Sequence, residues 1–403
     1  MLFGNNIYKK KINPVSIYCY VWSSVVFLYE LKLIKYYPLT LTTWGVVFIM
    51  QLLYVMGCYI AKKIYHEELK ATVDFEISST HSIKSQKVIL NIIIIITLIS
   101  GCVILLNVFQ FFRMFGFNLL GQTNELYLFR LTGSEGIKTI PYLGVLVYVS
   151  LIFSAVYTVQ YGFKKIFIIP MALIALEELT SGGRASLVLA PLMFVGVLLA
   201  SDVKSKFSKM QVGFVLTLVG ILFIVISSNR TAGIDNVYSS EFLYNITNGN
   251  PTVYKLIEYI TSPLGTLNAF LKDPTFSFGK NTFLTIYNLL NKIGYNINIS
   301  LYQDDFYVPM RVNVGTMLRE LIEDFTIGGC ALIIFFIGFC FSSSYLKFRN
   351  TLSYLYAIWV AVFFQIISFS FFDWRLRSSA EWIILVCGSV IGVYLDRKLR
   401  SYK

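Results

Sequence analysis

The side chains best suited to chemistry gather in one stretch of the sequence, Arg311–Gly329, which leads into the apolar run Cys330–Phe341. Five charged residues fall within it: Arg311, Arg319, Glu320, Glu323 and Asp324. Charged side chains beside a membrane-spanning run cost free energy, so they are expected there only where they have a function or a partner. One interpretation is an amphipathic helix that lies at the membrane interface with its charges in water. The other, which the rest of the chain favours, is an anion-binding and acid/base cluster on the outer face of a membrane protein.

Other arginines stand at the outer ends of apolar runs. Arg184 follows the turn Ser181–Gly183, and a helix that starts at Ala185 would direct its positive dipole end toward an anion there. Most lysines, in contrast, fall in the loops that the positive-inside rule assigns to the cytoplasm. A guanidinium group grips phosphate through two parallel hydrogen bonds and keeps its proton. We therefore expect a diphosphate to bind among these arginines: Arg184, Arg230, Arg311, Arg319, Arg375 and Arg377.

Carboxylates close to these arginines are the candidates for acid/base work. Asp324 and Glu323 are the carboxylates expected nearest to this ring of arginines, and Asp373 is a further candidate for a general base or for an acceptor from a sugar hydroxyl. Glu177 and Glu178 lie one to two turns before Arg184. They either pair with an arginine, which is the favoured interpretation, or accept a proton.

Composition places the chain among membrane proteins. Of 403 residues, 56% are hydrophobic and only 14% are charged, whereas soluble domains carry about 25% charged residues. The apolar runs are continuous, as in membrane helices, and do not alternate as barrel strands do. The pattern predicts about ten transmembrane helices: Val15–Tyr29, Leu39–Ala61, Val88–Phe109, Pro141–Phe163, Ile166–Thr180, Ala185–Ala200, Gln211–Ser228, Asp324–Leu346, Thr351–Phe372 and Trp382–Leu395.

The expected organisation is an all-α polytopic membrane protein with both ends in the cytoplasm. Residues 1–228 hold helices 1–7, residues 229–323 form a large outer loop, and residues 324–403 hold helices 8–10. Within the loop, Val253–Ile260 and Phe283–Leu290 are expected to form short amphipathic helices on the membrane surface. Tyrosines of the loop would suit sugar rings, although packing between short helices explains them equally well.

Several kinds of site are missing from the sequence. Its two histidines, His66 and His81, fall in a loop assigned to the cytoplasm, so an outer-face reaction has no histidine base and no histidine-ligated metal. No P-loop, GxSxG, HExxH or dinucleotide-binding motif occurs. The six cysteines form no CxxC pair and are typical of small core residues. The net charge of +12 lies at the ends of apolar runs and not in a basic domain, which excludes nucleic acid as the expected partner. We expect no metal and no cofactor.

Three features together resemble the bacterial O-antigen polymerase (Wzy) family. They are SGGRAS at the outer end of a span, the spacing N-x(10)-DF-x(2)-GG from Asn313 to Gly329 after a long outer loop, and FFDWRLRSS between the last two spans. Thr326 stands where the DFG motif of the family has glycine. The related O-antigen ligases use a histidine near the end of the long loop, whereas this chain has Arg311 and Asn313 there.

The resemblance implies a GT-C-like helical fold in the bacterial inner membrane, with an active site that faces the periplasm. Donor and acceptor would be oligosaccharides linked to undecaprenyl diphosphate, and a chain-length regulator and a flippase would be further partners beside membrane lipid. Arg184, Arg230 and Arg311 would bind the diphosphate, and Arg319, Arg375 and Arg377 are lesser candidates. Asp324 or Glu320 would orient or deprotonate the acceptor hydroxyl. The reaction would need neither metal nor nucleotide.

Three alternatives compete with a polymerase. A flippase for lipid-linked oligosaccharides would also need cations for diphosphate, but it should carry them inside its spans and show internal repeats. An O-antigen ligase or another lipid-linked glycosyltransferase shares the layout and differs in its acceptor. A scaffold or receptor without catalytic activity would not explain why arginines and lysines separate to different sides.

Overall fold

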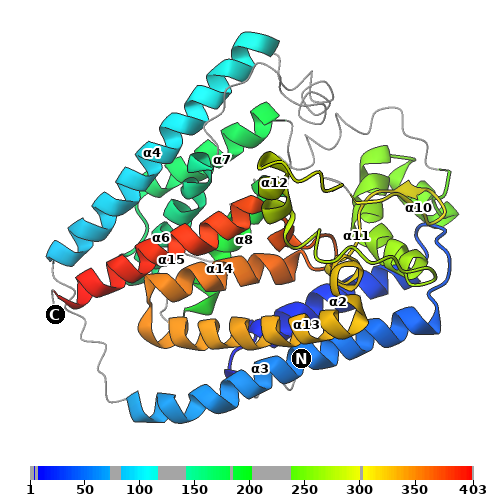
Figure 1. Cartoon of the computed structure of the whole chain (residues 1–403), viewed down its shortest axis with the longest axis horizontal. Helices are drawn as coiled ribbons and strands as arrows, with labels where there is room; N and C mark the ends of the chain where they lie inside the picture. Colours follow the sequence, from blue (N-terminus) through cyan, green and yellow to red (C-terminus); the bar gives the residue numbers. More distant parts are fainter. Residues whose placement is uncertain are drawn as a thin grey trace. The chain divides into compact units, whose positions relative to one another are not determined.

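The structure, a computed structural model, describes residue 4 and residues 8–72, 83–116, 142–181, 185–201, 237–299 and 303–401 (Figure 1). It is predominantly helical, as the sequence predicts. Five described helices are long and apolar enough to cross a membrane, all within these ranges: Leu41–Tyr65, Ile83–Phe115, Leu143–Tyr161, Met317–Thr351 and Ser379–Arg400. By length and composition the chain is therefore a helical membrane protein.

Apolar side chains on the surface of these helices agree with a lipid environment. On α4 (Ile83–Phe115) they recur at intervals of three to four residues, which places them along one face of the helix. A soluble protein seldom exposes so long an apolar stripe, whereas lipid tails cover it without cost. The exposed residues of this stripe are Ile95, Leu98, Ile99, Leu105, Leu106 and Phe109.

The chain divides into two compact units, and each is built from separate parts of the sequence. The first unit comprises Met1–Lys70, Gly233–Ser343 and Phe363–Trp382. It contains α2 (Pro14–Glu30), most of α3 (Leu41–Thr72), the helices of the long loop and the first part of α13 (Met317–Thr351). The end of α14 (Tyr354–Ser368), the short helix η3 (Arg375–Arg377) and the start of α15 (Ser379–Arg400) complete it.

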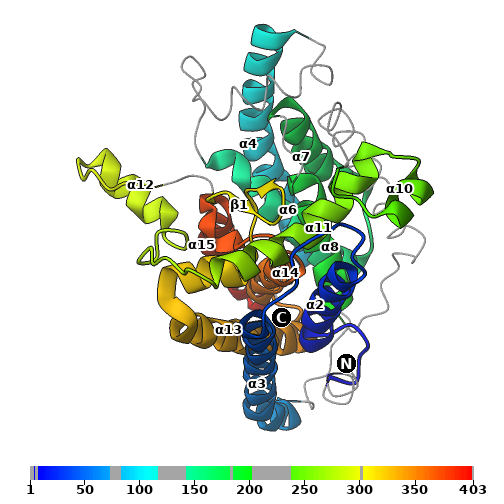
Figure 2. The same cartoon turned by 90° about the vertical axis from the view of Figure 1, so that its right-hand side faces the viewer.

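Two glycines let α3 and α13 pack backbone to backbone in this unit, where both views show the helices side by side (Figures 1 and 2). A Cβ on Gly57 would lie 2.1 Å from the carbonyl oxygen of Phe335, and a Cβ on Gly338 would lie 2.3 Å from that of Tyr54. The thiol of Cys58 also donates to the Gly338 carbonyl over 3.3 Å. Small residues at such crossings are typical of helix pairs in membranes, because packing rather than the hydrophobic effect holds them together.

The long loop forms three helices and a hairpin that pack within the first unit. α10 (Glu241–Thr247), α11 (Pro251–Phe270) and α12 (Leu284–Lys292) are followed by β1 (Phe306–Tyr307), which pairs antiparallel with β2 (Arg311–Val312). Near the buried end of α11, the Asn268 side chain accepts from the Thr40 amide at 2.8 Å and the Thr43 hydroxyl at 2.7 Å, which fixes the start of α3. The expected short helices are thus present, but α11 runs well past Ile260. α12 buries no residue and projects from the unit (Figure 2).

α13 is broken where the sequence departs from the DFG motif. The helix begins at Met317, earlier than the expected start at Asp324, and Thr316 caps it by accepting from the Arg319 amide at 3.1 Å. Thr326 then takes a non-helical backbone conformation, with φ 63° and ψ 177°. That region is almost restricted to glycine. Residues Met317–Phe325 therefore form a short, separate helix before the apolar part of α13.

The second unit comprises Ala71–Ala232, Ser344–Val362 and Ile383–Lys403. Its described helices are α4, η1 (Leu143–Val145), α6 (Leu146–Tyr161), η2 (Lys165–Phe167), α7 (Ile168–Ser181) and α8 (Ala185–Ala200), with parts of α13, α14 and α15. α4 packs against α6 and α7, and α6 against α8. Asp396 on α15 caps α14, because its carboxylate accepts from the amides of Tyr354 at 2.9 Å and Leu355 at 3.2 Å.

Described helices lie at nine of the ten segments expected to span the membrane, with shifted ends, and the number of about ten spans stays a prediction. The span expected at residues 211–228 lies outside the described residues. The division into residues 1–228, 229–323 and 324–403 concerns the sides of a membrane and stays a prediction.

The crossing of α3 and α13 gives a first prediction. Gly57→Ala should destabilise the protein by about 1–3 kcal/mol, because the added methyl group must push the two backbones apart. Gly45→Ala on the same helix is the matched control, since a Cβ there meets no atom within 4 Å. Thermal unfolding of the detergent-solubilised protein measures both. Equal midpoints for the two variants would contradict the close crossing.

The break in α13 gives a second prediction. Thr326→Gly should stabilise the protein by about 1–3 kcal/mol, because glycine adopts this backbone conformation without strain. Thr180→Gly, in the helical part of α7, should instead lose at least about 1 kcal/mol, because glycine disfavours the helix and the buried threonine side chain is removed. Denaturant unfolding of both variants provides the comparison. A Thr326→Gly variant that is less stable than the parent chain would show that the break is not strained.

Candidate functional site

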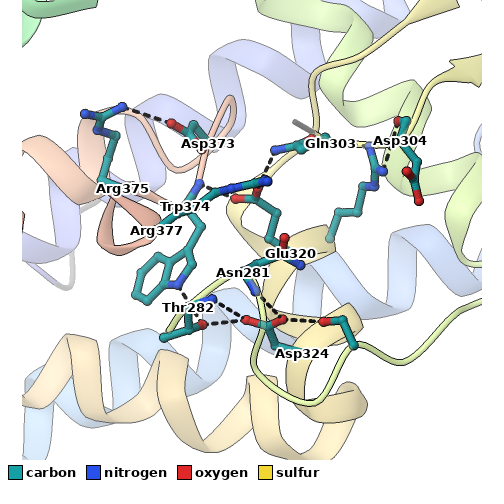
Figure 3. Close-up of polar contacts among 12 residues, drawn as sticks. Asn281, Thr282, Gln303, Asp304, Glu320, Asp324, Asp373, Trp374, Arg375 and Arg377 are labelled. Carbon is teal, nitrogen blue, oxygen red and sulfur yellow. Dashed lines mark hydrogen bonds and ion pairs between the residues drawn. The ribbon is translucent and has the colours of Figure 1, made fainter. Parts of the chain in front are cut away.

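The short helix Met317–Phe325 carries a buried carboxylate that three segments hold in place (Figure 3). Glu320 is fully buried and forms an ion pair with Arg377 at 2.7 Å. Its Oε1 also accepts from the Gln303 amide nitrogen at 2.6 Å, and its Oε2 accepts from the backbone amide of Trp374 at 2.7 Å. A buried charge is tolerated only when it is paired and hydrogen-bonded. The pair therefore joins the start of α13, the segment before β1 and the segment before α15.

Asp324 lies one turn after Glu320 and anchors the loop between α11 and α12. Its Oδ1 accepts from the Ser277 hydroxyl and from the backbone amide of Asn281 at 2.9 Å. Its Oδ2 accepts from the Thr282 amide at 2.6 Å and from the Thr282 hydroxyl at 2.7 Å. Each carboxylate oxygen offers two lone pairs, so all four acceptor sites of Asp324 are occupied.

Trp374 connects the two carboxylates. Its backbone amide donates to Glu320, and its indole N–H donates to the Thr282 hydroxyl over 2.9 Å. The same hydroxyl donates to Asp324. A continuous hydrogen-bonded path thus runs from Asp324 through Thr282 and Trp374 to Glu320, as the dashed lines of Figure 3 show.

Arg319 is a buried cation whose direct hydrogen-bond acceptors are neutral. Its side chain is 1% exposed, and it donates to the side-chain oxygen of Gln303 at 3.2 Å and to the Asp304 carbonyl at 3.1 Å. The guanidinium carbon lies 4.3 Å from the ring centre of Phe306, a contact that stabilises a cation. Its Nε has no acceptor among the described residues. Gly315 makes room for this arrangement, since a Cβ there would lie 2.7 Å from Cδ of Arg319.

Arg375 contacts two further carboxyl groups. It donates to Asp373 over 2.9 Å and to Glu381 over 3.0 Å. Glu381, at the start of α15, also accepts from the amide nitrogen of Gln365 at 2.7 Å. The turn between α14 and α15 is thereby fixed at both ends.

Arg311 and Asn313 do not join the buried cluster. Arg311 lies on β2, where its side chain is 69% exposed and pairs with Asp305. The hydrogen bond to Asp305 raises the pKa of Arg311. Asn313 is exposed after the hairpin. An exposed ion pair contributes little to stability, so Arg311 can exchange Asp305 for another anion at low cost.

The remaining predicted residues fall elsewhere. Glu177 lies on α7 in the second unit, near Gly144, whose added Cβ would lie 3.7 Å from its carboxylate. Arg184 and Arg230 lie outside the described residues. The structure therefore brings together Arg319, Glu320, Asp324, Arg375 and Arg377 of the predicted set, within one unit.

Sequence reasoning missed the neutral members of the cluster. Gln303, Thr282 and Ser277 carry no charge, and nothing in their local sequence distinguishes them from other polar loop residues. The sequence did not indicate Glu381 and Gln365 as site residues, because each lies within or beside an apolar run. A buried carboxylate demands donors, so Glu320 and Asp324 signalled that such partners exist but not which residues supply them.

The arrangement suits an anion and a hydroxyl better than a metal. Gln303 presents its oxygen to Arg319 and its N–H to Glu320. A ligand that carries an anionic oxygen and a hydroxyl group at a similar spacing could replace the Gln303 side chain. In the part of the chain that the structure describes, no group of three or more His, Cys, Asp or Glu side chains could hold a metal ion.

The filled acceptor sites of Asp324 give a third prediction. Asp324→Ala should lower stability strongly, because several buried donors lose their partner at about 1–3 kcal/mol each. Asp304→Ala is the control, since that side chain is exposed and only its carbonyl contacts Arg319. Thermal unfolding in detergent measures both. A parent-like midpoint for Asp324→Ala would show that the loop is held by other contacts.

Comparison with family models, with curated proteins and with solved structures finds no match to this chain. The function of the chain is therefore inferred from its fold, its buried cluster and its sequence motifs.

Proposed function

We propose that this protein is a membrane glycosyltransferase that polymerises oligosaccharide repeat units carried on undecaprenyl diphosphate. In this proposal it lies in the bacterial inner membrane with about ten spans and a GT-C-like arrangement, and its site faces the periplasm. The product would be O-antigen or a similar surface polysaccharide. The resemblance of SGGRAS, Asn313–Gly329 and FFDWRLRSS to the O-antigen polymerases motivates the substrate class.

One observation carries the proposal beyond that resemblance: Gln303 bridges a buried guanidinium and a buried carboxylate. The amide oxygen of Gln303 lies where an anionic oxygen of a ligand would accept a hydrogen bond from Arg319. Its amide N–H lies where a hydroxyl group of a ligand would donate to Glu320. A diphosphate and an attacking sugar hydroxyl are such a pair of groups. Because no carboxylate contacts Arg319 within ion-pair distance among the described residues, a diphosphate need not displace one.

In the proposed reaction, the donor glycan moves from its lipid diphosphate to the acceptor hydroxyl. The acceptor hydroxyl oxygen forms a bond to the anomeric carbon of the donor, and the bond from that carbon to the lipid diphosphate breaks. Arg319 and Arg377 meet the negative charge that develops on the leaving diphosphate, an effect that is often the largest single catalytic contribution. Arg184, Arg230, Arg311 and Arg375 stay candidates for the rest of the diphosphate site.

Glu320 is better suited than Asp324 to take the proton. When a ligand replaces Gln303, an acceptor position on Oε1 of Glu320 becomes vacant for the acceptor hydroxyl. Asp324 has no such vacancy, because four donors occupy it. We therefore assign Glu320 as the general base and Asp324 as the group that holds the surrounding loop.

A fourth prediction tests the site in cells. Arg319→Lys and Glu320→Gln should each reduce polymerisation by about 10²-fold or more, because one loses the planar donor set and the other the base. Arg397→Ala, an exposed change near the end of α15, should leave it unchanged. The length distribution of surface polysaccharide measures the effect, with membrane insertion checked in parallel. Parent-like chain lengths in both site variants would refute the assignment.

A fifth prediction tests the reaction in purified protein. Given only lipid-diphosphate oligosaccharide and a chelator, the protein should form dimers and longer products, because no step needs metal or nucleotide. The flippase alternative predicts that labelled lipid changes leaflet in vesicles without growing in length. Strict dependence on a divalent ion, or transport without elongation, would contradict the proposal.

A further inference from the structure

A second buried acid lies beside the cluster and takes no part in the proposed reaction. Glu381 begins α15, and Gln365 lies near the end of α14, both within the first unit. Their exposed fractions are 2% and 1%. The Gln365 amide nitrogen donates to Oε1 of Glu381 over 2.7 Å.

Two acceptor atoms of this pair have no donor. Oε2 of Glu381 and Oε1 of Gln365 are both buried and without a hydrogen-bond partner among the described residues. Leaving either one unsatisfied costs the free energy of removing that atom from water, which is larger for a charged carboxylate. When a carboxyl group and a primary amide meet edge to edge through one N–H···O bond, their remaining oxygens lie next to each other. One proton between them would satisfy both.

The neighbouring charges favour such a proton. Arg375 is the cation that contacts Glu381, and it also pairs with Asp373, so one positive charge faces two carboxylates. Arg375 does not bind Glu381 in the two-bond geometry of a strong pair, because it reaches only Oε1 and its Nε has no acceptor in the described part of the chain. Asp373 is the more exposed of the two carboxyl groups, at 26% against 3%. The negative charge is therefore more stable on Asp373 than on Glu381.

We propose that Glu381 is a buried proton-binding site: it holds a proton on Oε2 at neutral pH and donates it to Oε1 of Gln365. The two side chains then form a cyclic acid–amide pair with one N–H···O and one O–H···O bond. Arg375 and Asp373 form a neutral ion pair beside it. The inference is independent of the glycosyltransferase function, because it concerns only how this turn satisfies its buried groups.

Infrared spectroscopy of the purified, full-length protein tests the proton directly. An un-ionised carboxylic acid has a carbonyl stretch well above those of carboxylates and amides, and this band shifts in heavy water. The difference spectrum between the parent chain and Glu381→Gln should contain one such band at neutral pH. Glu241→Gln, which changes an exposed carboxyl group at the start of α10, should show none. Absence of the band from the Glu381→Gln difference, as expected for an ionised Glu381 bridged by water, would overturn the proposal.

Stability provides a second readout that does not depend on spectroscopy. Glu381→Gln should keep the parent unfolding midpoint, since an amide N–H replaces the acid O–H toward Gln365. Glu381→Ala and Gln365→Leu should both lower it, because each leaves a buried partner unsatisfied. If Glu381→Gln is as destabilising as Glu381→Ala, the carboxyl group is needed in its ionised form and the proposal fails. Both tests remain valid even if the protein has no glycosyltransferase activity.

Discussion

The structure of the first unit depends on keeping buried carboxylates satisfied in an apolar protein. Glu320 and Asp324 lie one turn apart, so they occupy one face of the short helix that begins α13. Each accepts hydrogen bonds from groups that come from distant parts of the sequence. Removing one partner of such a group leaves an uncompensated buried charge, which costs more than the pair itself contributes. The segments before β1, α12 and α15 are therefore fixed relative to this helix.

The break at Thr326 separates a charged part of α13 from an apolar part. Before it, Met317–Phe325 carries charges that need polar partners, and after it α13 is a long apolar helix with glycine at its crossing with α3. A continuous helix would carry both parts along one axis, whereas the break lets the polar segment turn toward the loop. Backbone strain at such positions persists only where surrounding contacts enforce it, and it is often found at functional sites. The bonds of Asp324, two residues earlier, are those contacts.

The proposed chemistry uses groups that the fold leaves incompletely matched. Arg319 donates its hydrogen bonds to neutral acceptors and lies against aromatic rings, and Gln303 shares its amide between Arg319 and Glu320. Arg377 and Arg375, in contrast, are balanced by carboxylates. Arg319, which the resemblance ranked below Arg311, is thus the buried cation of this cluster that has no carboxylate in ion-pair contact among the described residues. Availability for a ligand depends on partners and not on position in the sequence.

The sequence by itself determined the helical membrane class and most helix positions, because apolar runs and their length follow from the cost of exposing backbone to lipid. It also indicated the stretch Arg311–Gly329, since charges beside such runs are rare. Only the tertiary structure decided which charges meet: it joined Glu320 to Arg377, separated Arg311 from both, and supplied Gln303 and Thr282 as partners. Hydrogen bonds between residues far apart in the chain depend on how segments pack, and no local pattern of residue types records that packing.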